Sequence, residues 1–168
     1  MLKRILIADF DDEKRVNMTT PILYKPRGAL FTKAEQKFLD ALDAISGDAF
    51  RVFGKVRVSD ILIPSVNQFE KGSGWHWLFS QVSQKHVDFV ITDKQLNFLC
   101  AVELNDKSHE REDRIKRDNF LQEAFGSAGL ALVWVNLSSQ YLHQELAEQI
   151  ADVIAQSPHC DALLERVG

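Results

Sequence analysis

The stretches HVDFVI at residues 86–91 and CAVELN at residues 100–105 decide how this chain is interpreted. Each is apolar enough for a buried β-strand, yet each carries a carboxylate, Asp88 in the first and Glu103 in the second. Burying a lone carboxylate is costly, so such groups are usually paired, hydrogen-bonded or bound to a metal. Two buried carboxylates on neighbouring strands predict a metal site, and a metal site indicates a catalytic function.

The segments around these strands predict the fold. A short turn at 93–95 indicates an antiparallel hairpin of strands 87–92 and 98–104. A helix at about 111–128, ended by Gly129, precedes the continuous apolar strand 130–135. A last amphipathic helix is expected to start at Ser138 or Ser139.

Upstream, Thr32 and Glu35 have capping-box spacing, which predicts a helix from Thr32 to about 45. A strand is expected at 50–58. Residues 60–82 are expected to form a loop or short helical insertion. Packing of Trp75 and Trp77 against the core is favoured there, with stacking on a substrate as the alternative. The element order is then α-β-β-β-α-β-α, an α/β fold with a mixed sheet flanked by helices, because the crossover helix joins parallel strands.

Bulk properties narrow the class of protein. The chain has 168 residues and a net charge of −4, which argues against a constitutive nucleic-acid coat protein but not against an enzyme with a local basic groove. No apolar run approaches the roughly 20 residues that span a bilayer, so no membrane partner is expected. The two cysteines, Cys100 and Cys160, are expected to be reduced thiols in a cytoplasmic protein.

Three segments are expected along the chain. Residues 1–30 contain a charged run and two prolines and are interpreted as an N-terminal arm or linker. Residues 31–156 carry all the predicted helices and strands and form one domain. Residues 157–168 are interpreted as a C-terminal tail.

Side-chain alternation brings the polar residues together. Asp88 faces one side of its strand, and Glu103 and Asn105 face one side of the next, so the three converge if those faces coincide. Glu35 projects onto the inward stripe of its helix, either as a capping residue or as a site residue, and the two roles are compatible. Carboxylates, a backbone carbonyl and waters are the hard oxygen ligands that Mg²⁺ prefers.

The ordered motifs resemble the PD-(D/E)XK nuclease superfamily, which has the restriction-endonuclease-like fold, and within it the branch of small very-short-patch-repair-like endonucleases. The resemblance rests on VDF at 87–89, VELNDKSH at 102–109, Arg117-Asp118, Ala128-Gly129 and LVWV at 132–135. The run from Phe31 to Val135 also resembles a bacterial domain family of unknown function placed in this superfamily.

The resemblance implies a metal-dependent phosphodiester hydrolase in which Asp88 and Glu103 bind Mg²⁺ or Mn²⁺, with help from Glu35. The superfamily's lysine falls at Asn105, whose amide can orient a water but cannot supply a positive charge. Lys85, Lys107, Arg114 or Arg117 are the substitutes considered, with Lys85 disfavoured by strand parity. His109 occupies the position of the branch's histidine, as a general base or acid or as a structural turn residue.

Three functions follow as hypotheses. The first is a Mg²⁺-dependent nuclease acting on nucleic acid, with DNA favoured over RNA. The second is a catalytically degenerate nuclease-fold module that binds nucleic acid or a protein partner, motivated by Asn105 and the acidic net charge. The third is a structural interaction domain of a larger protein.

Overall fold

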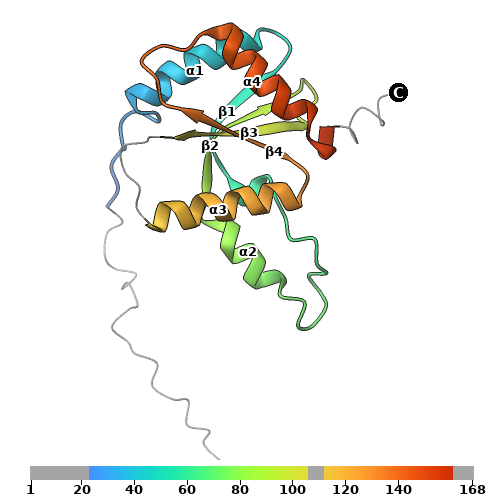
Figure 1. Cartoon of the computed structure of the whole chain (residues 1–168). Coiled ribbons are helices and arrows are strands. Elements are labelled where there is room, and N and C mark those ends of the chain that lie inside the picture. Colours follow the sequence, from blue (N-terminus) through green and yellow to red (C-terminus); the bar gives the residue numbers. More distant parts are fainter. Residues whose placement is uncertain (1–22, 106–111, 161–168) are drawn as a thin grey trace, which may run out of the picture. The chain divides into compact units, whose positions relative to one another are not determined.

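The computed structural model describes residues 23–105 and 112–160, and the chain divides into two compact units, Met1–Leu30 and Phe31–Gly168. The described residues 23–30 contain neither helix nor strand. The helices and strands of the described chain therefore belong to the second unit (Figure 1). No helix among the described residues is long and apolar enough to cross a membrane.

A four-stranded mixed sheet forms the centre of this unit. Its strands are β1 (Arg51–Arg57), β2 (His86–Thr92), β3 (Phe98–Asn105) and β4 (Ala131–Asn136), in the spatial order β1-β2-β3-β4. The pairs β1–β2 and β2–β3 are antiparallel, and β3–β4 is parallel. The predicted α/β fold with a mixed sheet is confirmed, as are the hairpin and the parallel crossover.

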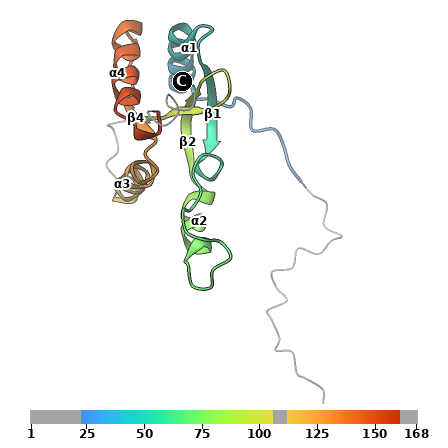
Figure 2. The same ribbon diagram turned by 90° about the vertical axis from the view of Figure 1, so that its right-hand side faces the viewer.

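Helices cover both faces of the sheet, as Figures 1 and 2 show. On one face lie α1 (Lys33–Ser46) and α4 (His143–Ala155), and on the other lie α2 (Trp75–Ser83) and α3 (Glu112–Ser127). A short 3₁₀ helix, η2 (Val58–Asp60), follows β1. The helical insertion expected between residues 60 and 82 is therefore present as α2.

Each face has its own apolar core. The side chains of Phe38 and Leu42 from α1 pack with Leu146 and Ile150 from α4 on one face. On the other, Leu121 and Phe125 from α3 pack with Val82 from α2 and with sheet residues Val87, Val90, Ala101 and Leu132. Because β2 and β3 are buried on both faces, their sequences are nearly continuous apolar runs.

Local sequence signals account for several element ends. The Thr32 hydroxyl accepts a hydrogen bond from the Glu35 amide, and the Glu35 carboxylate accepts one from the Thr32 amide at 2.7 Å, which completes the predicted capping box. Gly129 follows α3 with a φ of +68°, a conformation that glycine adopts without steric cost. In the β2–β3 turn, the Asp93 carboxylate accepts hydrogen bonds from both the backbone and the side chain of Asn97.

Two expectations need correction. The last helix begins at His143, not at Ser138 or Ser139, because the Ser138 hydroxyl donates to the Gln140 carbonyl at 2.6 Å and shapes a turn instead of capping a helix. Trp77 does not pack down, since 66% of it is exposed, whereas Trp75 stacks on Phe79.

The C-terminal part of the described chain is attached to the domain through Gly129. The Gly129 carbonyl accepts hydrogen bonds from the Ser157 hydroxyl at 2.6 Å and from the His159 amide at 3.0 Å. Both cysteines are free thiols and buried, and the Cys160 thiol donates to the Leu99 carbonyl in β3. Burial, with a smaller contribution from Cys160, raises the pKa of Cys100 to about 12.

Candidate functional site

A cavity of about 710 Å³ lies where the N-terminal end of α1, the C-terminal end of β3 and the first turns of α3 meet. Figure 1 shows these three ends toward the left-hand end of the sheet, with α1 on one face and α3 on the other. The cavity brings together four of the residues predicted for the site, Glu35, Asp88, Glu103 and Asn105, while His109 lies outside the described residues. The remaining lining residues are Thr32, Ala34, Leu104, Asp113, Arg114, Arg117, Asp118, Trp134 and Leu137.

Asp88 is held by two hydrogen bonds from neighbouring segments. Its Oδ2 accepts from the Leu104 backbone amide at 3.0 Å, and its Oδ1 accepts from the Lys55 ammonium at 2.8 Å. The β2–β3 register pairs Phe89 with Val102, and its continuation places Asp88 opposite Glu103. The two acids therefore face the same cavity from adjacent strands, as side-chain alternation predicted.

Glu103 is almost wholly enclosed, with 4% of its side chain exposed. Burial raises its pKa to about 7, because the charged form loses hydration; the Arg117 guanidinium opposes this shift only in part, and the charge of Asp88 adds to it. Arg117 Nη2 lies 2.9 Å from Glu103 Oε1. A carboxyl whose pKa lies near neutrality is a frequent feature of functional sites.

Arg117 connects α3 to this part of the sheet. Besides Glu103, its guanidinium donates to Asp118 at 3.0 Å and to the His86 carbonyl at 3.0 Å. Arg117 and Asp118, which are adjacent in the sequence, therefore form an ion pair in the lining of the cavity. These contacts fix the orientation of the buried carboxylate of Glu103.

Glu35 caps α1, as its sequence position predicted, and also lines the cavity. One carboxylate oxygen caps α1 through the Thr32 amide, and the other binds the Lys55 ammonium. Burial alone would raise the pKa of Glu35, but the hydrogen bonds from Lys55 and Thr32 outweigh it and lower the pKa. The Glu35 carboxylate is therefore an ionised group at the wall of the cavity.

Lys55 is the residue that sequence reasoning missed. It lies inside β1, where Gly54 pairs with Phe89 and Val56 pairs with Val87, which places Lys55 opposite Asp88. Burial would lower the pKa of its ammonium, but hydrogen bonds to Asp88 and Glu35 raise it. The signal in the sequence was a lysine in the middle of the predicted strand 50–58.

The cations predicted as substitutes for the superfamily's lysine do not all lie at the cavity. Lys85 donates to the Gln81 carbonyl, and its ammonium lies 4.5 Å from the centroid of the Phe120 ring, so it does not line the cavity. Arg114 and Arg117 do line it, and Lys107 lies outside the described residues. Asn105 ends β3, pairs with Asn136 and lines the same cavity.

The donor set fits a hard divalent cation in part. Within residues 23–105 and 112–160, no three His, Cys, Asp or Glu side chains are grouped closely enough to hold one ion. Mg²⁺ is usually bound by one or two carboxylates with waters in the remaining positions, and Asp88 and Glu103 supply that number. Glu35 also lines the cavity, and a ligand role for it stays a prediction.

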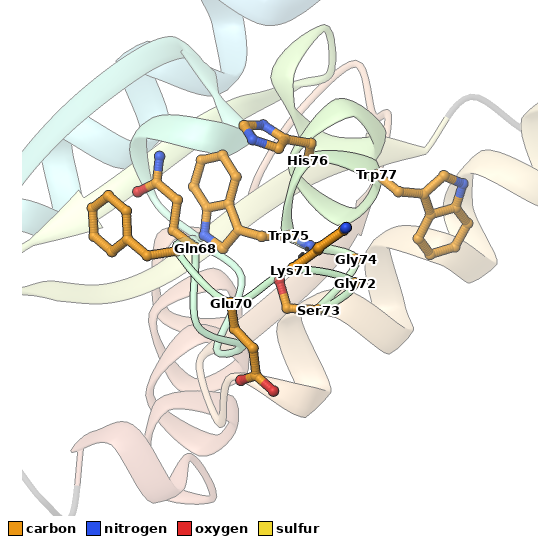
Figure 3. Close-up of a pocket in the computed structure, with 10 residues that line it drawn as sticks. Gln68, Glu70, Lys71, Gly72, Ser73, Gly74, Trp75, His76 and Trp77 are labelled. Atoms are coloured by element: carbon orange, nitrogen blue, oxygen red, sulfur yellow. Dashed lines mark hydrogen bonds between the residues drawn. The ribbon is translucent and has the colours of Figure 1, made fainter.

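A second, smaller hollow of about 300 Å³ lies at the start of α2 and is lined by residues 68–77 (Figure 3). Its lining includes Trp75 and Trp77, with Glu70 as the acid among them. The Trp77 ring lies apart from Trp75 in this view. Its lining contains one acid, whereas the described residues that line the larger cavity include five.

Comparison with known proteins identifies the family but no activity. Neither curated proteins nor solved structures include a significant match to this chain. Residues 27–154, more than half of the chain, match a family model described as a protein of unknown function, DUF2726. This chain therefore belongs to the DUF2726 family.

Proposed function

We propose that this protein is a metal-dependent nuclease of the PD-(D/E)XK superfamily that hydrolyses phosphodiester bonds in DNA. The observation that carries the proposal is the pair Asp88 and Glu103, which face one cavity from adjacent antiparallel strands. Burying the Glu103 carboxylate costs hydration free energy, which an apolar side chain at the same position would not lose. A bound cation would compensate this cost.

Asp88 and Glu103 are the residues that would hold Mg²⁺ or Mn²⁺. Such an ion supplies two things to hydrolysis: it lowers the pKa of a bound water and neutralises charge on the phosphoryl oxygens. In the proposed reaction a water oxygen bonds to phosphorus, the bond from phosphorus to one bridging ester oxygen breaks, and that oxygen takes up a proton. The products are a phosphate monoester and a free hydroxyl.

The chain's own groups orient the two carboxylates. The Leu104 amide fixes Asp88, and the Arg117 guanidinium fixes Glu103, so neither acid needs to reorganise when substrate arrives. The amide of Asn105 is suited to orient a water. His109 is proposed as the general base or acid near the scissile phosphate.

The proposal is tested by incubating the purified protein with supercoiled plasmid and with single-stranded DNA in Mg²⁺ or Mn²⁺. Wild-type protein is expected to cleave, and Asp88→Asn is expected to retain less than about one hundredth of the rate. Asp60→Asn is the matched control, because Asp60 forms a surface pair with Arg57 away from the cavity. Cleavage that persists unchanged in Asp88→Asn would come from a contaminant and would refute the proposal.

A catalytically degenerate module is the second candidate, favoured by the uncharged Asn105 at the end of β3. It predicts DNA or protein binding without cleavage in either metal. A gel-shift titration alongside the plasmid assay separates the two functions. We also propose that the protein acts in the cytoplasm, since both cysteines are free thiols.

A further inference from the structure

Lys55 has a backbone conformation that its position in a strand does not explain. Its φ is +56°, in the left-handed region that residues with a side chain rarely adopt. Among the described non-glycine residues, Leu96 also has a positive φ, but Leu96 lies in the β2–β3 turn, where such a conformation is common. Lys55 instead lies between two residues that are paired with β2.

This conformation accompanies a specific set of contacts. The Lys55 ammonium binds the carboxylates of both Asp88 and Glu35, and 32% of the side chain is exposed. Both acids line the cavity, one from β2 and the other from α1. Backbone strain that persists at such a place is typical of functional sites, where the surrounding structure maintains it.

The charges of the residues that line the cavity indicate a role for the positive charge of Lys55. Among the residues that the structure describes, five acids and the two cations Arg114 and Arg117 line it, and the Arg117 guanidinium binds Glu103 and Asp118. A phosphodiester is an anion, so a cation next to Asp88 would weaken the repulsion between the acid and the substrate. Asn105 cannot provide it.

We propose that Lys55 is the catalytic cation of this site and that its ammonium contacts the phosphate of the DNA substrate beside Asp88. The inference rests on the proposed nuclease function and adds to it the residue that carries the positive charge. The lysine side chain has four flexible methylenes, so the ammonium can exchange a carboxylate for a phosphate oxygen without moving β1. The competing explanation is a structural ion pair that ties α1 to the sheet.

The test uses Lys55→Asn and Lys55→Gly, because asparagine and glycine both tolerate the left-handed backbone. Single-turnover cleavage of DNA in Mg²⁺ is measured together with the Mn²⁺ affinity by calorimetry and with the thermal midpoint. Both variants are expected to lose at least about 30-fold in cleavage rate. Both are also expected to bind Mn²⁺ as tightly as wild type or more tightly, because a competing positive charge has been removed.

Two further variants complete the design. Lys85→Asn is the matched control, since its ammonium lies over Phe120 and outside the cavity, and it should cleave within about threefold of wild type. Asn105→Lys added to Lys55→Asn should recover at least about tenfold of the lost rate, because Asn105 lines the cavity that Asp88 lines and a lysine there would supply a cation.

The outcomes separate this inference from the proposed function. If wild-type protein does not cleave, the nuclease proposal fails and the inference falls with it. If wild-type protein cleaves and both Lys55 variants cleave within about threefold of it, the nuclease proposal stands and Lys55 is only structural. A rate loss matched by an equal loss of Mn²⁺ affinity or of folding also overturns the inference, because the lysine would then act by holding Asp88 and Glu35.

Discussion

At Gly54, the addition of a single methyl group is expected to disturb the candidate site. A Cβ added to Gly54 would lie 2.2 Å from Cζ and 2.6 Å from Cε1 of the Phe31 ring. Carbon atoms approach comfortably to about 3.5 Å, so the ring must move by more than roughly 1 Å. Phe31 directly precedes Thr32, the N-cap of α1, and therefore lies next to the segment that carries Glu35.

The magnitude of the Gly54→Ala effect follows from the two contacts that Phe31 would lose or strain. Forcing an extra methyl group into a packed position costs about 1–3 kcal/mol. The Phe31 ring also stacks on Phe89 with centroids 5.3 Å apart, and breaking such a pair costs about 0.5–1.5 kcal/mol. We expect the free energy of unfolding to fall by about 2–3 kcal/mol, and cleavage to fall with it because Glu35 is displaced.

Urea unfolding followed by circular dichroism measures the effect, and Phe31→Ala provides the matched background. With the ring removed, the added methyl group has room, so Gly54→Ala should cost less than about 0.5 kcal/mol in that background. The loss of unfolding free energy caused by Gly54→Ala should thus be at least about 1 kcal/mol larger in wild-type protein than in Phe31→Ala. Equal effects in the two backgrounds would refute the argument that Phe31 occupies the space at Gly54.

The remaining predictions concern the acids and the cap. The pKa of Glu103 rises from 4.5 to about 7 on folding. Between these two values the folded state keeps a proton that the unfolded state has lost, so the free energy of unfolding of the metal-free protein should fall by up to about 3 kcal/mol as the pH rises from 4.5 to about 7. Glu103→Gln should abolish that slope in urea titrations between pH 4.5 and 8, and an unchanged slope would contradict the assignment. Mg²⁺ at about 100 times its Kd should stabilise wild-type protein by about 2.7 kcal/mol in thermal unfolding and should not stabilise Asp88→Asn; an equal gain in both would place the ion elsewhere. Thr32→Ala removes the cap of α1 and should cost about 1 kcal/mol in urea unfolding, whereas Thr32→Ser should cost little, and equal losses would argue against capping.

Local signals were sufficient for much of the fold. The capping box of Thr32 and Glu35 depends on residues three apart, so it could be recognised without knowing any long-range contact. Strand alternation likewise placed Asp88 and Glu103 on one face, because both strands are regular around these residues. The predicted start of the last helix was wrong because a serine hydroxyl can either cap a helix or bond within a turn. The Ser138 hydroxyl forms the turn.

Lys55 could not be found by the same means. Its contact with Asp88 depends on the β1–β2 register, and η2 and α2 lie between those two strands in the chain. Its left-handed φ is also not encoded by an apolar–polar pattern, which describes faces and not backbone conformations. The contact between Arg117 and Glu103 was missed for a related reason, since it joins a helix to a strand across the crossover.

The buried thiol of Cys100 gives this chain an internal probe of its own opening. With a pKa of about 12, Cys100 holds almost no thiolate near neutral pH, and the thiolate is the form that alkylating reagents attack. Labelling of Cys100 therefore requires the strand to separate from its neighbours and expose the sulfur to water. Because Cys100 pairs with Ala131 on one side and Ile91 on the other, its labelling rate counts openings of the β2–β3–β4 layer. A lower labelling rate in Mg²⁺ than without it would show that binding of the ion makes separation of these strands less frequent.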